Sequence, residues 1–327
     1  QVGSTVLDSR FRGNDGMGLV CDQPAPFNGI RVHSRFSFVR ICRLQPSSQG
    51  VCLIKKGLSF AILLGLISLF ALPTQAQVLT FTREQLIKFT GKNPFERFPD
   101  GRPKVPDQIL EKVKELSAEE AWGVLSAAKY QNQFAGGFRL LHPGKKLVGR
   151  VVTAQFMPLR PDVADVADAD AKANGMTKSN NQRVIDLLQP GDVVVVDLFG
   201  KIEGGTFVGD NLATAIFSAT KTGFVVDGAI RDLEGIYPLD MAAYFRGVHP
   251  TPIGNVMLTG INIPIRIGDA TVMPGDVVLG DREGVYFIPP HMIEEIVKKA
   301  EITHIHDEWT KNKFLTGSYK SSDLYST

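Results

Sequence analysis

The stretch Asp192-Val193-Val194-Val195-Val196-Asp197-Leu198-Phe199 sets the expected fold of this chain. Four consecutive valines predict a strand that is buried on both faces, as in a parallel sheet covered on either side. A second strand is expected at 223–227. Between the two lies 211–220, where apolar residues such as Leu212 and Ile216 recur at helical spacing. Strand, loop, helix and strand in this order predict a parallel crossover unit and therefore an α/β domain.

Further strands are expected on both sides of this unit. One covers 147–156, before the crossover unit. Turn chemistry separates the strands that follow Pro250 and predicts antiparallel pairing for them; these strands are expected at 255–258, 263–267, 277–279 and 285–288. The sequence therefore predicts a mixed sheet, with a parallel part followed by an antiparallel part.

Helical segments flank the expected core, which covers residues 136–290. Residues 77–135 are expected to form a helical arm, because Thr82 can cap a helix and Ser117 with Glu120 forms a capping box before another. Residues 291–327 are expected to form a C-terminal helix and tail, with one apolar stripe made by Ile293, Ile296, Val297 and Ala300.

Residues 53–76 have the layout of a secretory signal peptide. Lys55 and Lys56 precede an apolar run at 58–72, and small residues precede a cut after Ala76. An uncleaved N-terminal anchor is the alternative. The mature protein is then expected in the periplasm or outside the cell, with no stable membrane insertion after cleavage. Residues 1–52 are interpreted as a disordered, over-extended reading frame.

Composition narrows the classes of function. A formal net charge of +2 over 327 residues gives no indication of a nucleic-acid partner. The three cysteines, Cys21, Cys42 and Cys52, all precede residue 77. A mature chain that starts there has no thiol nucleophile and no disulfide.

Two segments combine residues that can carry chemistry. The first is a glycine-rich loop, 204–209, that leads into the predicted helix; a helix start presents free backbone N–H groups that suit a carboxylate or a phosphate. The second is the segment 225–232, a strand ending in a turn that carries Arg231 and Asp232. Arg231 offers a planar fork for a substrate carboxylate, and Asp232 offers an oxygen ligand for Mg²⁺. Taken alone, an adjacent Arg-Asp pair is more often a surface ion pair.

The spacing of these residues carries a family resemblance. Asp210 precedes Arg231 by twenty intervening residues, and Asp232 follows at once. This pattern resembles the 4-hydroxy-4-methyl-2-oxoglutarate aldolase family, which includes the regulators of ribonuclease activity A. Further matches follow in order, at 190–197, 209–213, 226–232, 274–278 and 281–285, so that the resemblance runs from about residue 147 to 289. One departure is Leu198-Phe199 after Asp197, where the family usually has a glycine.

The resemblance implies an α/β fold, a β/β/α sandwich of the swivelling-domain type, here with an N-terminal helical arm and a C-terminal helix. It implies a homotrimer or hexamer with sites between subunits. Mg²⁺ or Mn²⁺ would bind Asp232. The substrate carboxylate would bind Arg231 and the backbone near Gly209, Asn211, Leu212 and Ala213. Asp210 would lie close to the water that transfers a proton. A neighbour's C-terminal helix would supply a catalytic carboxylate, with Glu308 or Asp307 as the candidate.

The implied activity is that of a divalent-metal-dependent lyase. Its substrates would be 2-oxo acids: it would cleave 4-hydroxy-2-oxo acids by a retro-aldol reaction, decarboxylate oxaloacetate, or do both, in each case through the enolate of pyruvate. The alternative is a non-catalytic regulatory or small-carboxylate-binding ring of the same fold. Asp210, Arg231 and Asp232 occurring together favours the enzyme.

Overall fold

The computed structural model describes residues 79–324, so the predicted leader at 53–76 and the segment before it lie outside the described residues. Within this range a nine-stranded sheet has the order β1-β11-β10-β3-β4-β5-β6-β2, and β7 pairs with β3 off this path. Its strands are β1 (Phe134–Gly136), β2 (Arg139–Leu140), β3 (Leu147–Pro158), β4 (Asp192–Lys201), β5 (Gly223–Ile230), β6 (Ala242–Val248), β7 (Val256–Ile261), β10 (Val277–Gly280) and β11 (Gly284–Ile288). A separate hairpin joins β8 (Ile265–Ile267) and β9 (Ala270–Val272).

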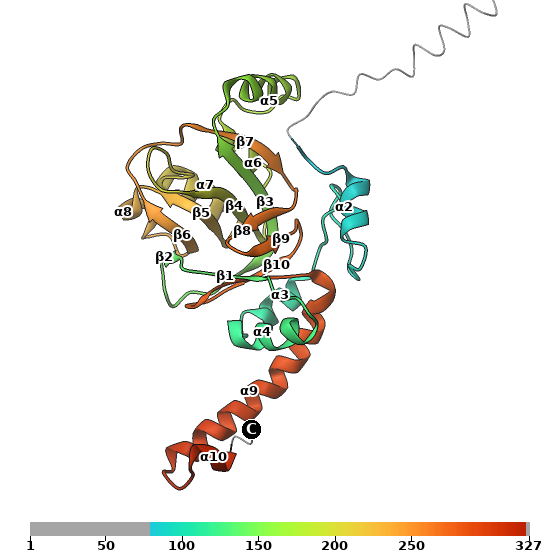
Figure 1. The fold of residues 1–327 in the computed structure, drawn as a ribbon, viewed down its shortest axis with the longest axis vertical. Helices are drawn as coiled ribbons and strands as arrows, with labels where there is room; N and C mark the ends of the chain where they lie inside the picture. The colour runs from blue at the N-terminus through green and yellow to red at the C-terminus, as the bar shows by residue number, and fades with distance from the viewer. Residues whose placement is uncertain (1–78, 325–327) are drawn as a thin grey trace, which may run out of the picture. The chain divides into compact units, whose positions relative to one another are not determined.

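The helices lie around this sheet (Figure 1). They are α2 (Arg83–Phe89), α3 (Asp107–Val113), α4 (Ala118–Ala127), α5 (Pro161–Ala173), α6 (Asn180–Ile185), α7 (Asp210–Thr220), α8 (Leu233–Ile236), the 3-10 turn η1 (Pro290–Met292), α9 (Ile293–Leu315) and α10 (Ser321–Leu324). None of the helices at 79–324 is long and apolar enough to cross a membrane.

The predicted mixed sheet is confirmed. Strands β3, β4, β5 and β6 run parallel to one another, while β10, β11, β1, β2 and β7 pair antiparallel. The valines at 193–196 are fully buried, because alternate side chains point into two different cores. Hydrophobic layers on both faces of the central strands make the β/β/α arrangement that the sequence predicted.

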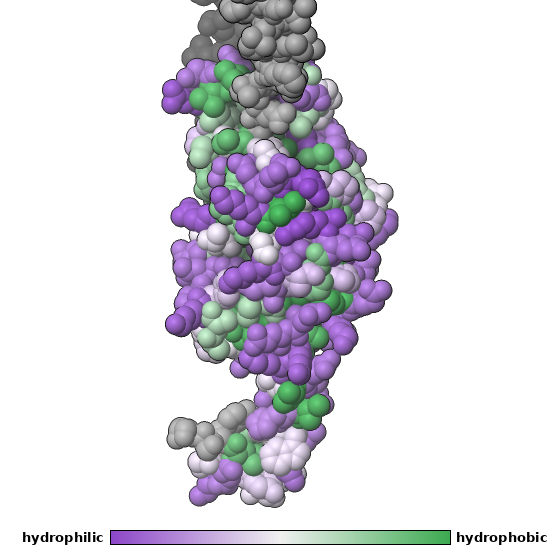
Figure 2. All heavy atoms as spheres, turned by 90° about the vertical axis from the view of Figure 1, so that its right-hand side faces the viewer, coloured by the Kyte–Doolittle hydropathy of each residue, from purple (hydrophilic) through white to green (hydrophobic). Residues whose placement is uncertain are grey.

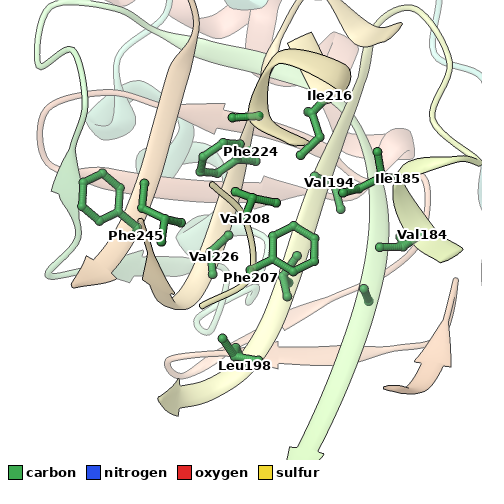
Figure 3. Close-up of a cluster of buried hydrophobic side chains, with 14 of the residues drawn as sticks. Val184, Ile185, Val194, Leu198, Phe207, Val208, Ile216, Phe224, Val226 and Phe245 are labelled. Carbon is green, nitrogen blue, oxygen red and sulfur yellow. The ribbon is translucent and has the colours of Figure 1, made fainter. Parts of the chain in front are cut away.

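Three hydrophobic clusters hold the layers together. The first lies between the central strands and the helices α6 and α7 (Figure 3). The second lies on the opposite face of the central strands, beneath the β8–β9 hairpin. The third joins the arm helices α3 and α4 to β10, β11 and the first turns of α9. The arm and the C-terminal helix are therefore packed onto the antiparallel end of the sheet.

Local sequence signals account for the helix starts. The Thr82 and Ser117 side chains each accept a hydrogen bond from the backbone three residues on, which confirms both predicted caps. Glu120 completes the predicted capping box of Ser117, and Gln85 completes a second box with Thr82. Helix α5 forms at 161–173, where no helix was predicted. That helix buries only Ala171, so it lacks the apolar stripe by which a helix is recognised.

The departure from the family pattern after Asp197 has a backbone consequence. Phe199 adopts a φ of 45°, in the left-handed region that favours glycine, and Gly200 follows at 71°. Beyond this point the register between β4 and β5 is interrupted between Asp197 and Lys201. A bulky residue thus occupies a position whose conformation suits the glycine of the family pattern.

Candidate active site

The loop before α7 is fixed by two hydrophobic anchors. Phe207 and Val208 are buried in the cluster beneath α7, among side chains such as Ile216 and Phe224 (Figure 3). The loop also pairs with the end of β5. The Phe207 N–H donates to the Ala229 carbonyl at 2.9 Å, and the Arg231 N–H donates to the Val208 carbonyl at 3.0 Å. These contacts bring the start of α7 alongside the residues that follow β5.

Helix α7 begins at this anchored point. Gly209 is its N-cap in an extended conformation, and Asp210 is its first residue. The Asp210 carboxylate accepts a hydrogen bond from the Asn211 N–H at 2.8 Å. The Ala213 N–H donates to the Gly209 carbonyl at 2.9 Å. Of the four backbone positions predicted to bind a substrate carboxylate, Gly209 and Leu212 have N–H groups without a partner among the described residues.

Arg231 and Asp232 lie directly after the last residue of β5, as predicted. Their side chains are 36% and 38% exposed, with Arg231 Nε 3.5 Å from Asp232 Oδ2. Asp232 has a φ of 57° and a ψ of 44°, and its carbonyl accepts the N–H groups of Gly235 and Ile236 in α8. This left-handed backbone is uncommon for an aspartate and turns the chain sharply into α8.

The three predicted residues converge over two glycines. A Cβ added to Gly209 would lie 2.2 Å from Asp232 Oδ2 and 3.1 Å from Arg231 Nε. A Cβ added to Gly235 would lie 2.7 Å from Asp210 Oδ2. The Arg231 and Asp232 side chains therefore rest against the N-cap of α7, while the Asp210 carboxylate rests against α8. The sequence separation of Asp210 from Arg231 is closed by the α7–β5 crossover.

The donor set fits a hard cation that keeps most of its water. No group of three or more His, Asp and Glu side chains in the described part of the chain could enclose a metal. Mg²⁺ commonly takes only one or two carboxylates and completes its shell with waters and substrate. Asp232 is accessible enough for this, since its side chain is 38% exposed, and the absence of a side chain on Gly209 lets its carboxylate lie against the N-cap of α7.

The predicted C-terminal carboxylates do not join this group within one chain. Glu308 and Asp307 lie in the outer half of α9, which extends away from the sheet, on the side remote from α7 and α8 (Figure 1). Glu308 is 65% exposed at the side chain and lies 3.7 Å from His304 of its own helix. A role for either carboxylate requires a neighbouring subunit and stays a prediction.

A second polar group was missed by the sequence reasoning. Gln155, Asp197 and Asp227 occupy paired positions on β3, β4 and β5. Arg246 on β6 donates to Asp227 at 2.6 Å. Burial raises the pKa of Asp197, and the nearby Asp227 charge raises it further. The repeated pattern of valines followed by Asp in two adjacent parallel strands is the signal that could have revealed this row.

The chain is similar to known proteins over most of the region that contains this site. The family description "RraA-like: Aldolase/RraA" matches residues 108–287, more than half of the chain. The chain belongs to the RraA-like family. The matched range of this RraA-like chain contains Asp210, Arg231 and Asp232 but neither α2 nor α9.

Individual relatives support the same assignment. A protein of Halalkalibacterium halodurans, provisionally named 4-hydroxy-4-methyl-2-oxoglutarate aldolase, is 30% identical over 160 residues, which are 48% of this chain and 75% of that protein. Protein DlpA of Legionella pneumophila is 28% identical over 56% of this chain, a region that spans only 28% of DlpA. The solved structure of RraAS2 from Streptomyces coelicolor, described as an unusual member of the RNase ES inhibitor RraA protein family, is 27% identical with a TM-score of 0.54, covering 67% of this chain and 99% of that one.

Proposed function

We propose that this RraA-like chain is a divalent-metal-dependent lyase that breaks a carbon–carbon bond in small 2-oxo acids. The observation that carries the proposal is the convergence of Asp210, Arg231 and Asp232 at the junction of α7, β5 and α8. Relatives named as aldolases of 4-hydroxy-4-methyl-2-oxoglutarate add support for this class of reaction. The proposed substrates are 4-hydroxy-2-oxo acids and oxaloacetate.

Each residue has a distinct role in this proposal. The Arg231 guanidinium holds the substrate carboxylate through paired hydrogen bonds, and the Leu212 N–H at the positive end of α7 adds a further donor. Asp232 holds Mg²⁺ or Mn²⁺, which when bound supplies Lewis-acid polarisation of the 2-oxo group. Asp210 orients a water that receives the proton of the 4-hydroxyl group.

The proposed reaction balances without a further reagent. Loss of the 4-hydroxyl proton lets the C3–C4 bond break, with its electron pair moving to the pyruvate fragment as an enolate. Protonation of that enolate at carbon gives pyruvate, and the other fragment leaves with a new carbonyl group. Loss of carbon dioxide from oxaloacetate produces the same enolate, so one site can serve both reactions.

The test is pyruvate release from oxaloacetate and from 4-hydroxy-4-methyl-2-oxoglutarate, with Mg²⁺ or with EDTA. We expect metal-dependent turnover that Arg231→Ala and Asp232→Ala each reduce by roughly 100-fold or more. Asp269→Ala, in the exposed turn between β8 and β9, is the matched control and is expected to retain full turnover. Absence of turnover from folded protein with both substrates would contradict the proposal.

The second candidate is a ring that binds small carboxylates without turnover. The description of RraAS2 as part of an inhibitor family favours keeping it. It predicts that pyruvate binds the folded protein, that Arg231→Ala abolishes this binding, and that no substrate is consumed. The predicted export of the chain, and with it a periplasmic or secreted location, depends on residues outside the described range and remains part of the proposal.

A further inference from the structure

A cavity of about 510 Å³ lies between the end of α2 and the core of the RraA-like domain. One wall comes from Lys88 through Asn93, and the other from β9, the β9–β10 turn and η1. Figure 2 views the molecule from the side on which α2 lies, where the surface is mostly hydrophilic with isolated hydrophobic residues. None of Asp210, Arg231 and Asp232 lines this cavity.

The arm wall lies outside the range of the family match. It precedes residue 108, where that match begins, whereas most of the opposite wall falls inside the matched range. The arm is held in place independently of any ligand. Within the arm, Phe89 stacks on Phe81 at 5.1 Å. The arm joins the core through the ion pair of Arg102 with Asp192 at 3.2 Å, and through the Leu79 N–H, which donates to the Thr259 carbonyl at 3.2 Å. The cavity is therefore a preformed feature of the arm and core together.

Two lysines that have no carboxylate partner among the described residues give the cavity a preference for anions. Lys88 and Lys92 both line it, and neither ammonium has a carboxylate within 4.0 Å among residues 79–324. The His291 ring is also in the wall. Its pKa is lowered by burial and then by the Lys92 charge, so the field of Lys92 reaches this side of the cavity. An anionic group is the natural partner of this pair.

The remaining surface favours a flat apolar body. Phe89 is 61% exposed although it is a large aromatic residue, and it lines the same wall as Lys88 and Lys92. Tyr130 also lines the cavity, with its hydroxyl 3.0 Å from His291 Nε2. Binding pockets for small ligands typically combine such apolar and aromatic walls with a few polar groups, in volumes of about 300–1,000 Å³.

The buried acid Asp276 also lines the cavity, and it does not exclude an anionic ligand. Asp276 is 3% exposed and accepts a hydrogen bond from the Met273 N–H at 2.9 Å. Burial raises the pKa of Asp276 to about 7, so near neutral pH a large share of these carboxyl groups carry no charge. A protonated carboxyl can donate a hydrogen bond to an oxygen of the ligand.

We propose that this cavity is a second binding site, separate from Arg231 and Asp232, which takes a small aromatic carboxylate. The ring would lie against Phe89 and Tyr130, and the carboxylate would lie between Lys88 and Lys92. Because one wall lies outside the family match and the other mostly inside it, the site would depend on the arm and the RraA-like core together.

The test uses the whole chain and benzoate, 4-hydroxybenzoate and the neutral analogue benzamide as probes, with binding measured by saturation-transfer NMR and calorimetry. We expect benzoate and 4-hydroxybenzoate to bind and benzamide to bind at least about tenfold more weakly, since each tenfold change corresponds to about 1.4 kcal/mol. Lys88→Ala combined with Lys92→Ala should weaken benzoate by a similar factor. The matched double variant Lys298→Ala with Lys311→Ala, which removes the same charge from α9, should bind like the parent.

Arg231→Ala separates this site from the proposed catalytic site. Benzoate binding that persists in Arg231→Ala and is lost in the Lys88/Lys92 variant supports the second site, whether or not the protein shows lyase activity. Binding that is lost in Arg231→Ala, binding unaffected by the Lys88/Lys92 variant, or no binding of either carboxylate overturns it.

Discussion

Gly235 shows how closely the candidate site depends on residues without side chains. It lies in α8, and its Cα faces the Asp210 carboxylate so closely that an added Cβ would lie 2.6 Å from Asp210 Cβ. Gly209 bears the same relation to Asp232. The positions of Asp210 and Asp232 therefore require glycine at 235 and 209, because any larger side chain there would overlap them.

We predict that Gly235→Ala lowers lyase turnover about tenfold or more while the protein stays folded. The new methyl group displaces Asp210, and alanine is otherwise the better helix former by about 1 kcal/mol. Turnover and thermal unfolding of the same samples check this. Gly123→Ala in α4 is the matched control, because an added Cβ there meets no atom within 4 Å. Unchanged turnover in Gly235→Ala would mean that the position of Asp210 does not matter.

Asp276 gives a prediction for the pH dependence of stability. Burial raises the pKa of Asp276 from 3.8 to about 7 in the folded chain, so the folded state favours the protonated carboxyl. This group is neutral in both states well below pH 3.8, and it lowers the free energy of unfolding progressively as the pH rises from about 4 to 7. The loss reaches roughly 4 kcal/mol at most, at about 1.4 kcal/mol per pKa unit.

Asp276→Asn should therefore remove part of the loss of stability between about pH 4 and pH 7. Urea unfolding of the variant and the parent at several pH values measures the difference directly. The carbonyl oxygen of asparagine can still accept the Met273 N–H, so the turn itself is retained. Parallel pH curves for the two proteins would show that Asp276 does not titrate in this range.

At the scale of elements, the start of α4 joins the arm to the core. Ser117 and Glu120 form the capping box, and the Ala118 N–H donates to Asp281 Oδ2 at 2.8 Å from the β10–β11 turn. Helix α4 buries Val124 and Leu125 against β10, β11 and α9. Its first turn is also fixed, by Ser117 of the arm and by Asp281 of the sheet.

Loss of this cap should destabilise the whole domain modestly. We predict that Ser117→Ala lowers the free energy of unfolding by about 1 kcal/mol, the usual cost of an N-cap serine. Thr82→Ala, which removes the exposed cap of the short helix α2, should cost less. Urea denaturation of both variants checks the order. Equal losses would indicate that the contact with Asp281 contributes nothing to the cap of α4.

At the scale of the whole molecule, large hydrophobic side chains on the outer half of α9 are exposed within the described part of the chain. Ile302, Ile305, Trp309 and Leu315 are all at least half exposed there, and Figure 2 shows hydrophobic residues on this projecting end. The inner turns of the same helix are buried against α3 and α4. An exposed apolar stretch of this kind is expected to contact another subunit, in keeping with the proposed trimer or hexamer.

Subunit mixing tests whether two chains share one site. We predict that Asp232→Ala and Glu308→Ala are each inactive alone, and that co-expression of the two restores part of the turnover. In the mixed assembly, the Glu308→Ala chain supplies Asp232 and the neighbouring Asp232→Ala chain supplies Glu308, so that some interfaces contain an intact site. Co-expression of Asp232→Ala with Arg231→Ala is the control, because both variants lack a residue of the same half-site. Activity in Glu308→Ala alone would remove this residue from the proposal.

Much of the fold could be predicted from local patterns. The valine run and the crossover helix correspond to β4 and α7, and the four strands predicted after Pro250 correspond to β7, β8, β10 and β11, since period and turn chemistry are properties of neighbouring residues. Asp210, Arg231 and Asp232 were also found from spacing, because the crossover brings the start of α7 beside the end of β5. Helix α5 was not predicted, since it buries only Ala171 and so has no apolar stripe.

Only the tertiary structure decided the details on which the site depends. The contacts of Gly209 and Gly235, the left-handed backbone of Asp232 and the engagement of the Asn211 and Ala213 amides all involve chain segments that meet through packing. The row of Gln155, Asp197 and Asp227 depends on strand register, and the cavity at α2 depends on where the arm lies. The sequence by itself determined which elements form and which residue types could carry chemistry. Their distances were decided by the cores on the two faces of the sheet, because burial of non-local apolar surface fixes how elements meet.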